Sequence, residues 1–68
     1  MSATIRVNGR DEEFAAVTVA ELLHRRGIDG SRGVAVAVNG IVAPSRSWGS
    51  HALAAGDEVE IVRPFGGG

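Results

Sequence analysis

The residues of this chain best suited to chemistry lie at its C-terminal end, where Phe65 precedes Gly66, Gly67 and Gly68. Glycines lack Cβ atoms, so such a segment can enter a channel too narrow for other residues. The carboxylate expected on Gly68 is ionised at neutral pH and resists nucleophilic attack until it is activated, and the activated form we expect is a mixed anhydride with AMP. The chain has neither a cysteine nor a phosphate-binding glycine loop with lysine, so a partner protein must perform this step.

Terminal glycines also have a simpler explanation, because chain ends often fray and recombinant expression can leave extra residues. The pattern of a folded domain ends at Pro64, and the four residues beyond it reach about 13–14 Å when extended. We therefore predict a domain over residues 1–63 and a flexible tail over residues 64–68. A glycine tail directly after a folded domain favours the functional interpretation, in which the chain is a substrate without catalytic residues.

Two histidines and two charged clusters are the remaining candidates for a site. His24 and His51 have no cysteine or clustered carboxylates beside them, so we expect no metal and no cofactor. The acidic run 11–13 could meet a basic partner surface, although a solvated turn is the commoner role. The arginines at 25–26 suit the carbonyl end of a helix better than a binding patch.

Composition narrows the class of protein. The 68 residues carry a formal net charge of −1 and have a hydrophobic fraction of 44% with no cysteine, which indicates one folded domain without disulfides. All seven basic residues are arginines, and they are scattered along the chain, so we expect neither nucleic acid nor a membrane as partner. The N-terminus lacks the layout of a signal peptide, which makes the cytoplasm the expected location.

The first half of the chain predicts a hairpin and a helix. Residues 3–7 alternate as a half-buried strand, Asn8-Gly9 is typical of a tight turn, and residues 12–16 can return as a strand with Phe14 inward. Thr18-Val19-Ala20-Glu21 fits a capping box, and the apolar stripe behind it continues along the aliphatic stem of Arg26. Gly27 can end this helix in the left-handed conformation, with Ile28 folding back.

The second half predicts a smaller hairpin and a last strand. Residues 33–38 place valines on one face and alanines on the other, and Asn39-Gly40 is a second turn signal. Residues 41–42 start a short return strand that Pro44 ends. One helical turn over residues 45–48 would lay Trp48 on the core, and residues 58–62 alternate again. The fold class is α+β: a ubiquitin-like β-grasp with a mixed four- to five-stranded sheet packed on one helix.

The chain resembles the ThiS family of sulfur carriers in thiamine-thiazole biosynthesis. The similarity runs in order through nearly the whole length, in segments 7–9, 18–23, 34–42, Pro44, Trp48, 56–57, 59–62 and 67–68. Within it, the arginine that the family often shows directly after the proline is displaced by one, to Arg46, so the resemblance does not carry over a contact made by that arginine. Gly66 occupies a variable family position.

The resemblance implies a mechanism and two partners. A ThiF-type adenylating enzyme would use ATP to activate Gly68, sulfur would replace AMP to give a thiocarboxylate, and thiazole synthase would consume it. Gly66 and Gly67 would thread the tail into the partner. Ala35 and Ala37 could form a flat docking face with Phe65 as an anchor, although Phe65 could equally cover the edge of the core.

Three other functions are consistent with the same pattern. The small subunit of molybdopterin synthase shares the fold and the diglycine end, and a protein-conjugating modifier is a further variant. A non-covalent β-grasp interaction or RNA-binding module belongs to a different class, and it would favour a clustered basic face over a free glycine end.

Overall fold

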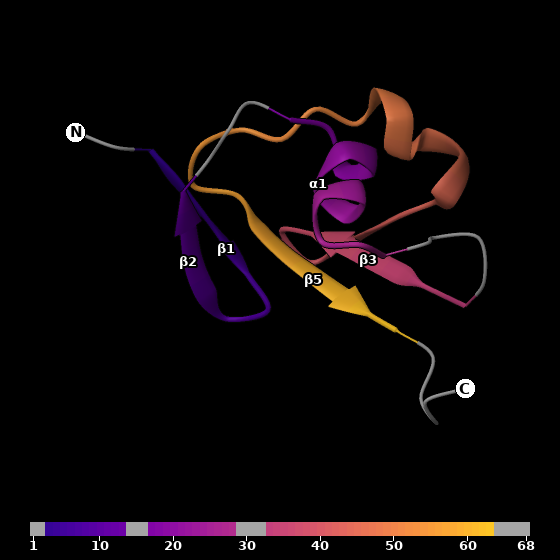
Figure 1. The fold of residues 1–68 in the computed structure, drawn as a ribbon, viewed down its shortest axis with the longest axis horizontal. Coiled ribbons are helices and arrows are strands. Elements are labelled where there is room, and N and C mark those ends of the chain that lie inside the picture. Colours follow the sequence, from indigo (N-terminus) through magenta and orange to yellow (C-terminus); the bar gives the residue numbers. More distant parts are fainter. Residues whose placement is uncertain (1–2, 14–16, 29–32, 64–68) are drawn as a thin grey trace.

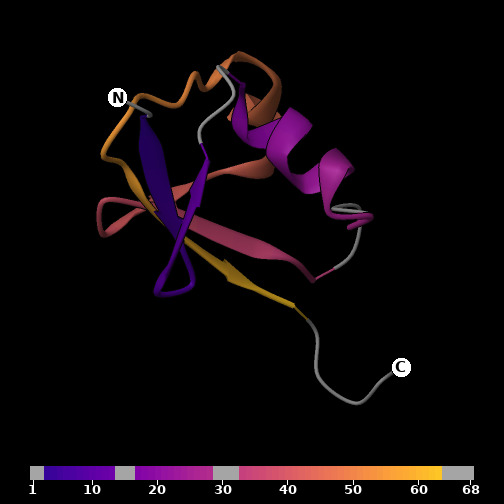
Figure 2. The same ribbon diagram turned by 60° about the vertical axis from the view of Figure 1, so that its left-hand side comes forward.

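The computed structural model describes residues 3–13, 17–28 and 33–63, which form one sheet covered by helices (Figure 1). The elements follow in chain order: β1 (Thr4–Val7), β2 (Arg10–Glu13), α1 (Val19–Arg25), β3 (Ala35–Val38), β4 (Ile41–Ala43), the 3-10 helix η1 (Ser45–Ser50) and β5 (Glu58–Val62). The sheet has five strands in the order β2-β1-β5-β3-β4. The pair β1–β5 is parallel and the other neighbours are antiparallel, and α1 and η1 lie on the same side of the sheet (Figure 2).

The first hairpin has the predicted turn, but its second strand begins earlier than predicted. Asn8 and Gly9 have φ angles of 50° and 84°, which a two-residue hairpin turn requires at both positions. Such a turn places Arg10 directly opposite Val7, so β2 begins two residues before the predicted range 12–16. The predicted inward position of Phe14 lies outside the described residues.

Helix α1 begins and ends where the sequence predicts. The Thr18 hydroxyl accepts a hydrogen bond from the Glu21 amide at 3.2 Å, and the stripe of Val19, Leu22 and Leu23 is buried. At the other end Gly27 has a φ of 70°, and the Ile28 amide returns to the Leu23 carbonyl at 2.9 Å. Both ends are therefore set by local sequence.

The C-terminal half of the sheet follows the predicted pattern with shifted boundaries. Strand β3 begins at Ala35 and not at Gly33, because Gly33 has a φ of 67° and cannot continue a strand. Strand β4 ends at Ala43, before Pro44. The predicted helical turn is a 3-10 helix that continues to Ser50, and its buried Trp48 donates from Nε1 to the Ala43 carbonyl at 2.7 Å.

The core lies between the sheet and the two helices and is almost entirely aliphatic. Its buried residues are Ile5, Val7, Val17, Val19, Leu22, Leu23, Val36, Val38, Ala43, Trp48, Leu53, Val59 and Ile61. Every strand except the edge strand β2 contributes to this set, as expected for a sheet with one covered face. No helix of the described residues has the length and hydropathy that crossing a bilayer requires.

Candidate functional site

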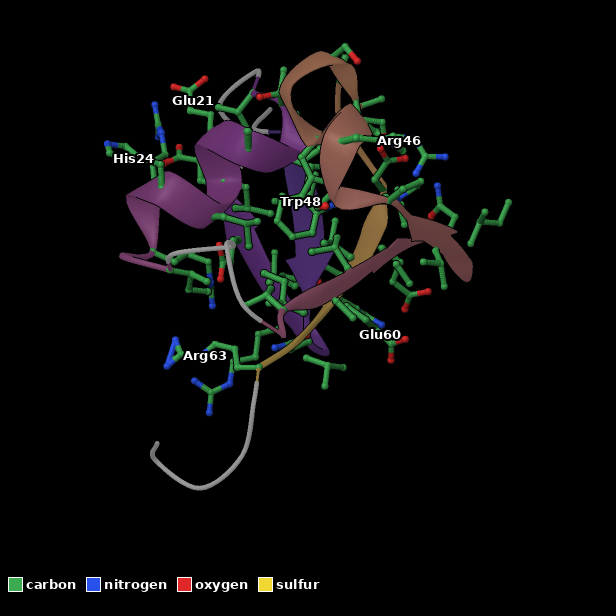
Figure 3. All side chains as sticks on the ribbon, turned by 90° about the vertical axis from the view of Figure 1, so that its right-hand side faces the viewer. Glu21, His24, Arg46, Trp48, Glu60 and Arg63 are labelled. Atoms are coloured by element: carbon green, nitrogen blue, oxygen red, sulfur yellow. The ribbon has the colours of Figure 1, made fainter. Side chains whose placement is uncertain are left out.

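Strand β5 carries the chain from the centre of the sheet to the predicted tail. It pairs with β1 on one side and β3 on the other, and its alternating pattern buries Val59 and Ile61. Glu60 lies on the side of the sheet away from α1, and Arg63 lies where the strand ends (Figure 3). The predicted tail residues, Phe65, Gly66, Gly67 and Gly68, lie outside the described residues, so their roles remain predictions.

An apolar area covers the outer face of the sheet beside the end of β5. Ala35 pairs with Val62, and Ala37 lies between Val42 of β4 and Glu60 of β5. Val42 and Val62 are 71% and 62% exposed, Ala35 is exposed and Ala37 is half-buried. We call Ala35, Ala37, Val42 and Val62 the outer apolar patch. The predicted shared face of the two alanines is confirmed, whereas their contact with a partner remains a prediction.

Sequence reasoning missed the two valines of this patch, although the pattern held a signal for each. In β5 the alternation of exposed and buried positions places Val62 on the outer face, where the preceding positions hold Glu58 and Glu60. In β4 two successive large apolar residues, Ile41 and Val42, cannot both face the core of a sheet with one covered side, and both are exposed. An apolar residue at an outward position was the available sign of a binding surface.

The other half of the outer face is ionic. Arg6 of β1 lies 3.1 Å from Asp11 of β2, measured from Nε to Oδ1, and 3.9 Å from Glu58 of β5, measured from Nη1 to Oε2. These side chains are more than half exposed, so each pair contributes little to stability. The outer face therefore carries its ion pairs over β2, β1 and the start of β5, and the outer apolar patch over β3, β4 and the end of β5, with Glu60 beside the patch.

The remaining candidates have surface positions. His24 is exposed on α1 and His51 is half-buried after η1, and residues 3–13, 17–28 and 33–63 hold no group of three or more potential metal ligands. In the acidic run, Asp11 pairs with Arg6, and Glu12 pairs with Arg26 at the end of α1. Arg46, the displaced arginine, is exposed on η1 (Figure 3).

The sheet order, the crossover helix α1 and the parallel pairing of β1 with β5 define a ubiquitin-like β-grasp protein. Comparison with known proteins then gives the family. The model of the ThiS family matches residues 5–68. The chain therefore belongs to the ThiS family, the small sulfur carriers of thiamine biosynthesis.

Solved structures and a related enzyme agree with this assignment. The crystal structure of the thiamine biosynthesis protein ThiS from Geobacter metallireducens is 28% identical, with a TM-score of 0.79 over 96% of this chain and 99% of that one. A solution structure of a thiamine biosynthesis protein from the same organism gives a TM-score of 0.77 at 28% identity, over 96% and 87% of the two chains. A thiazole synthase of Paramagnetospirillum magneticum is 43% identical over 63 residues. That match covers 91% of this chain but 19% of the enzyme, so the chain spans about a fifth of its relative.

Proposed function

We propose that the carboxylate of Gly68 is the group that carries sulfur. A partner of the ThiF type transfers AMP from ATP to this carboxylate and releases pyrophosphate. Sulfide sulfur then attacks the acyl carbon and displaces AMP, which leaves a C-terminal thiocarboxylate. Membership of a sulfur-carrier family is the observation that carries the proposal, and the match of the family model includes residues 64–68.

The outer apolar patch supports a docking role next to this chemistry. Val62 is the last residue of β5 and belongs to the patch, so a protein seated on the patch lies beside the point from which the tail departs. Exposed apolar side chains in a cluster are typical of binding surfaces. In this proposal the adenylating enzyme contacts the patch, Phe65 anchors the tail, and Gly66 and Gly67 pass into the active site with Gly68.

Thiazole synthase is the proposed acceptor of the sulfur. A thiazole synthase contains a segment that is 43% identical to this chain, which supports a working relation between such a segment and that enzyme. The thiocarboxylate suits the transfer, because its sulfur is a strong nucleophile and its acyl group is a competent leaving unit. An oxygen atom, supplied by water, replaces the departing sulfur at the acyl carbon, so the chain returns to the carboxylate form and can be activated again.

Intact mass spectrometry tests the proposal directly. The chain is incubated with ATP, a ThiF-type enzyme and a sulfide source, and the expected product is heavier by about 16 Da, the difference between sulfur and oxygen. A variant without Gly67 and Gly68 is the control and should gain no mass. Fragmentation of the product locates the added mass. Added mass on any residue other than Gly68 would contradict the proposal.

A matched pair of alanine substitutions tests the docking surface. Ala35→Arg places a charged side chain in the outer apolar patch, whereas Ala55→Arg makes the same change at an exposed residue of the turn before β5. Because neither alanine is buried, both variants should keep the melting temperature of the parent. Only Ala35→Arg should slow adenylation. Equal rates for the two variants would exclude the patch as the docking surface.

Phe65→Ala tests the proposed anchor in the same assay. It should weaken adenylation and leave the melting temperature nearly unchanged. A lower melting temperature with normal adenylation would instead assign Phe65 to the edge of the core.

A further inference from the structure

Asn8, in the turn between β1 and β2, binds the main chain of β5 with its side chain. Its Oδ1 accepts a hydrogen bond from the Ile61 amide at 2.7 Å, and its Nδ2 donates to the Ile61 carbonyl at 3.3 Å. Both bonds are partly buried, and they join residues 53 positions apart in sequence. One side chain thus satisfies both main-chain groups of a single residue near the end of β5.

The position of this carboxamide explains its role. In the parallel pairing of β1 and β5, the Arg6 amide donates to the Asp57 carbonyl and the Asn8 amide donates to the Val59 carbonyl, both at 2.9 Å. In a regular parallel ladder the next bond would join the Ile61 amide to the main-chain carbonyl of Asn8. Asn8 turns away from the sheet with a φ of 50°, and its side chain supplies the oxygen instead. The carboxamide therefore acts as one more peptide unit of β1.

Asn39, in the turn between β3 and β4, makes the equivalent contact at the other end of β5. Its main-chain amide donates to the Glu58 carbonyl at 2.7 Å, and its Oδ1 accepts from the Glu58 amide at 3.0 Å. Its Nδ2 donates to Asp57 at 3.0 Å. The two Asn-Gly turns thus hold β5 from opposite sides, Asn39 where the strand begins and Asn8 where it approaches the tail.

We propose that Asn8 is a positioning residue that sets the point at which the chain leaves the sheet toward Gly68. This inference rests on the function proposed above, in which a partner seated on the outer apolar patch must also receive Gly68. Without the carboxamide, the β1 side of β5 is held only as far as Val59, and both main-chain groups of Ile61 lose their partner. The end of β5, from Glu60 to Val62, is then held from the β3 side alone.

The length of chain between the last held residue and Gly68 decides how often Gly68 reaches a partner already seated on the sheet. With β5 intact, residues 63–68 span this distance. β3 still pairs with β5 as far as Val62, so loss of the carboxamide makes the strand end open more often and does not hold it open. While the end is open back to Val59, residues 60–68 span the distance. Effective concentration falls roughly as the −3/2 power of length, so lengthening from six residues to nine lowers it about twofold. The chemical step within the partner is unchanged, so the effect falls on KM and not on kcat.

Asn8→Gly and Asn39→Gly form a matched pair for the test. Glycine accepts the positive φ at both positions, so each variant keeps its turn and loses only the side-chain bonds. In hydrogen exchange, Asn8→Gly should raise the rate at the Ile61 amide about fivefold, the factor that loss of one ordinary hydrogen bond gives. With a ThiF-type enzyme, it should raise KM by up to about twofold and leave kcat unchanged. Asn39→Gly should alter exchange at Glu58 and leave KM as in the parent.

Several results would overturn the assignment. An unchanged exchange rate at Ile61 in Asn8→Gly, or an equal change of KM in both variants, would each reject it. Asn8→Asp guards against a general loss of folding, because it keeps the oxygen that accepts from Ile61, and it should give values between the parent and Asn8→Gly. Failure of the parent chain to be adenylated would refute the proposed function instead, and exchange at Ile61 would still decide whether Asn8 holds the strand.

Discussion

The two valines of β5, Val59 and Val62, allow the contributions of core and surface to be separated within one strand. Val59 is fully buried between the sheet and the helices, whereas Val62 is 62% exposed on the outer face. Val59→Ala removes two buried methyl groups, at about 0.8 kcal/mol each for transfer alone, and leaves a cavity. We therefore expect a loss of about 2–3 kcal/mol. A domain of 68 residues has a total stability of about 3–10 kcal/mol, so this loss is a large part of it.

Val62→Ala makes the same chemical change where little apolar surface is buried. We expect it to cost less than about 0.5 kcal/mol, as is usual for surface substitutions. Urea unfolding followed by far-UV circular dichroism, with Trp48 fluorescence as a second probe, measures both variants against the parent. The midpoint for Val59→Ala should fall with no change in m-value. In the adenylation assay Val62→Ala should be the more strongly impaired variant, because Val62 belongs to the outer apolar patch and Val59 does not.

Equal losses of stability in the two variants would refute the assignment of inner and outer faces on β5. Normal adenylation of Val62→Ala, with stability as in the parent, would show that Val62 is not part of the docking surface. That result would not bear on the fold. The two measurements therefore test the core and the proposed site independently.

Substitutions at three further positions are tested by urea unfolding. Thr18→Ala removes the cap of α1 and should cost about 1 kcal/mol, whereas Thr18→Ser should cost much less. Gly27→Ala should cost about 1–2 kcal/mol from the left-handed backbone alone, because no atom lies within 4 Å of the added Cβ; a neutral result would contradict this account of the helix end. Glu12→Gln breaks the link between β2 and Arg26 and should cost less than about 1 kcal/mol, with a difference that shrinks in high salt.

Much of the fold was predictable because its signals are local. The caps of α1 depend on residues within one or two turns of the helix, and the two Asn-Gly turns need only their own positive φ angles. The start of β2 was predicted two residues too late, because the acidic run 11–13 crowds it and acidic residues are uncommon in strands. At the edge of the sheet these side chains remain solvated or pair with arginines, so the turn geometry decides where the strand begins.

The parts that sequence reasoning missed depend on which strands become neighbours. The positive φ of a tight turn is enough to explain an asparagine at position 8. No residue near Asn8 in the sequence therefore indicates that its side chain also binds Ile61, 53 residues away. The outer apolar patch likewise joins residues of β3, β4 and β5, and its extent follows from their register. The alanine face of β3 was predicted because it lies within one strand.

The place of β5 in the sheet has a consequence for how the chain is made. The strand that occupies the middle of the sheet is the last of the five in chain order, and both of its neighbours precede it. While the chain emerges from the ribosome, the two hairpins can form early but have no common strand to join them. Contacts of such long sequence separation form late and slow folding. The two halves therefore become one domain only when translation has passed Val62, so a polypeptide that stalls earlier exposes an unfinished sheet to cellular proteases.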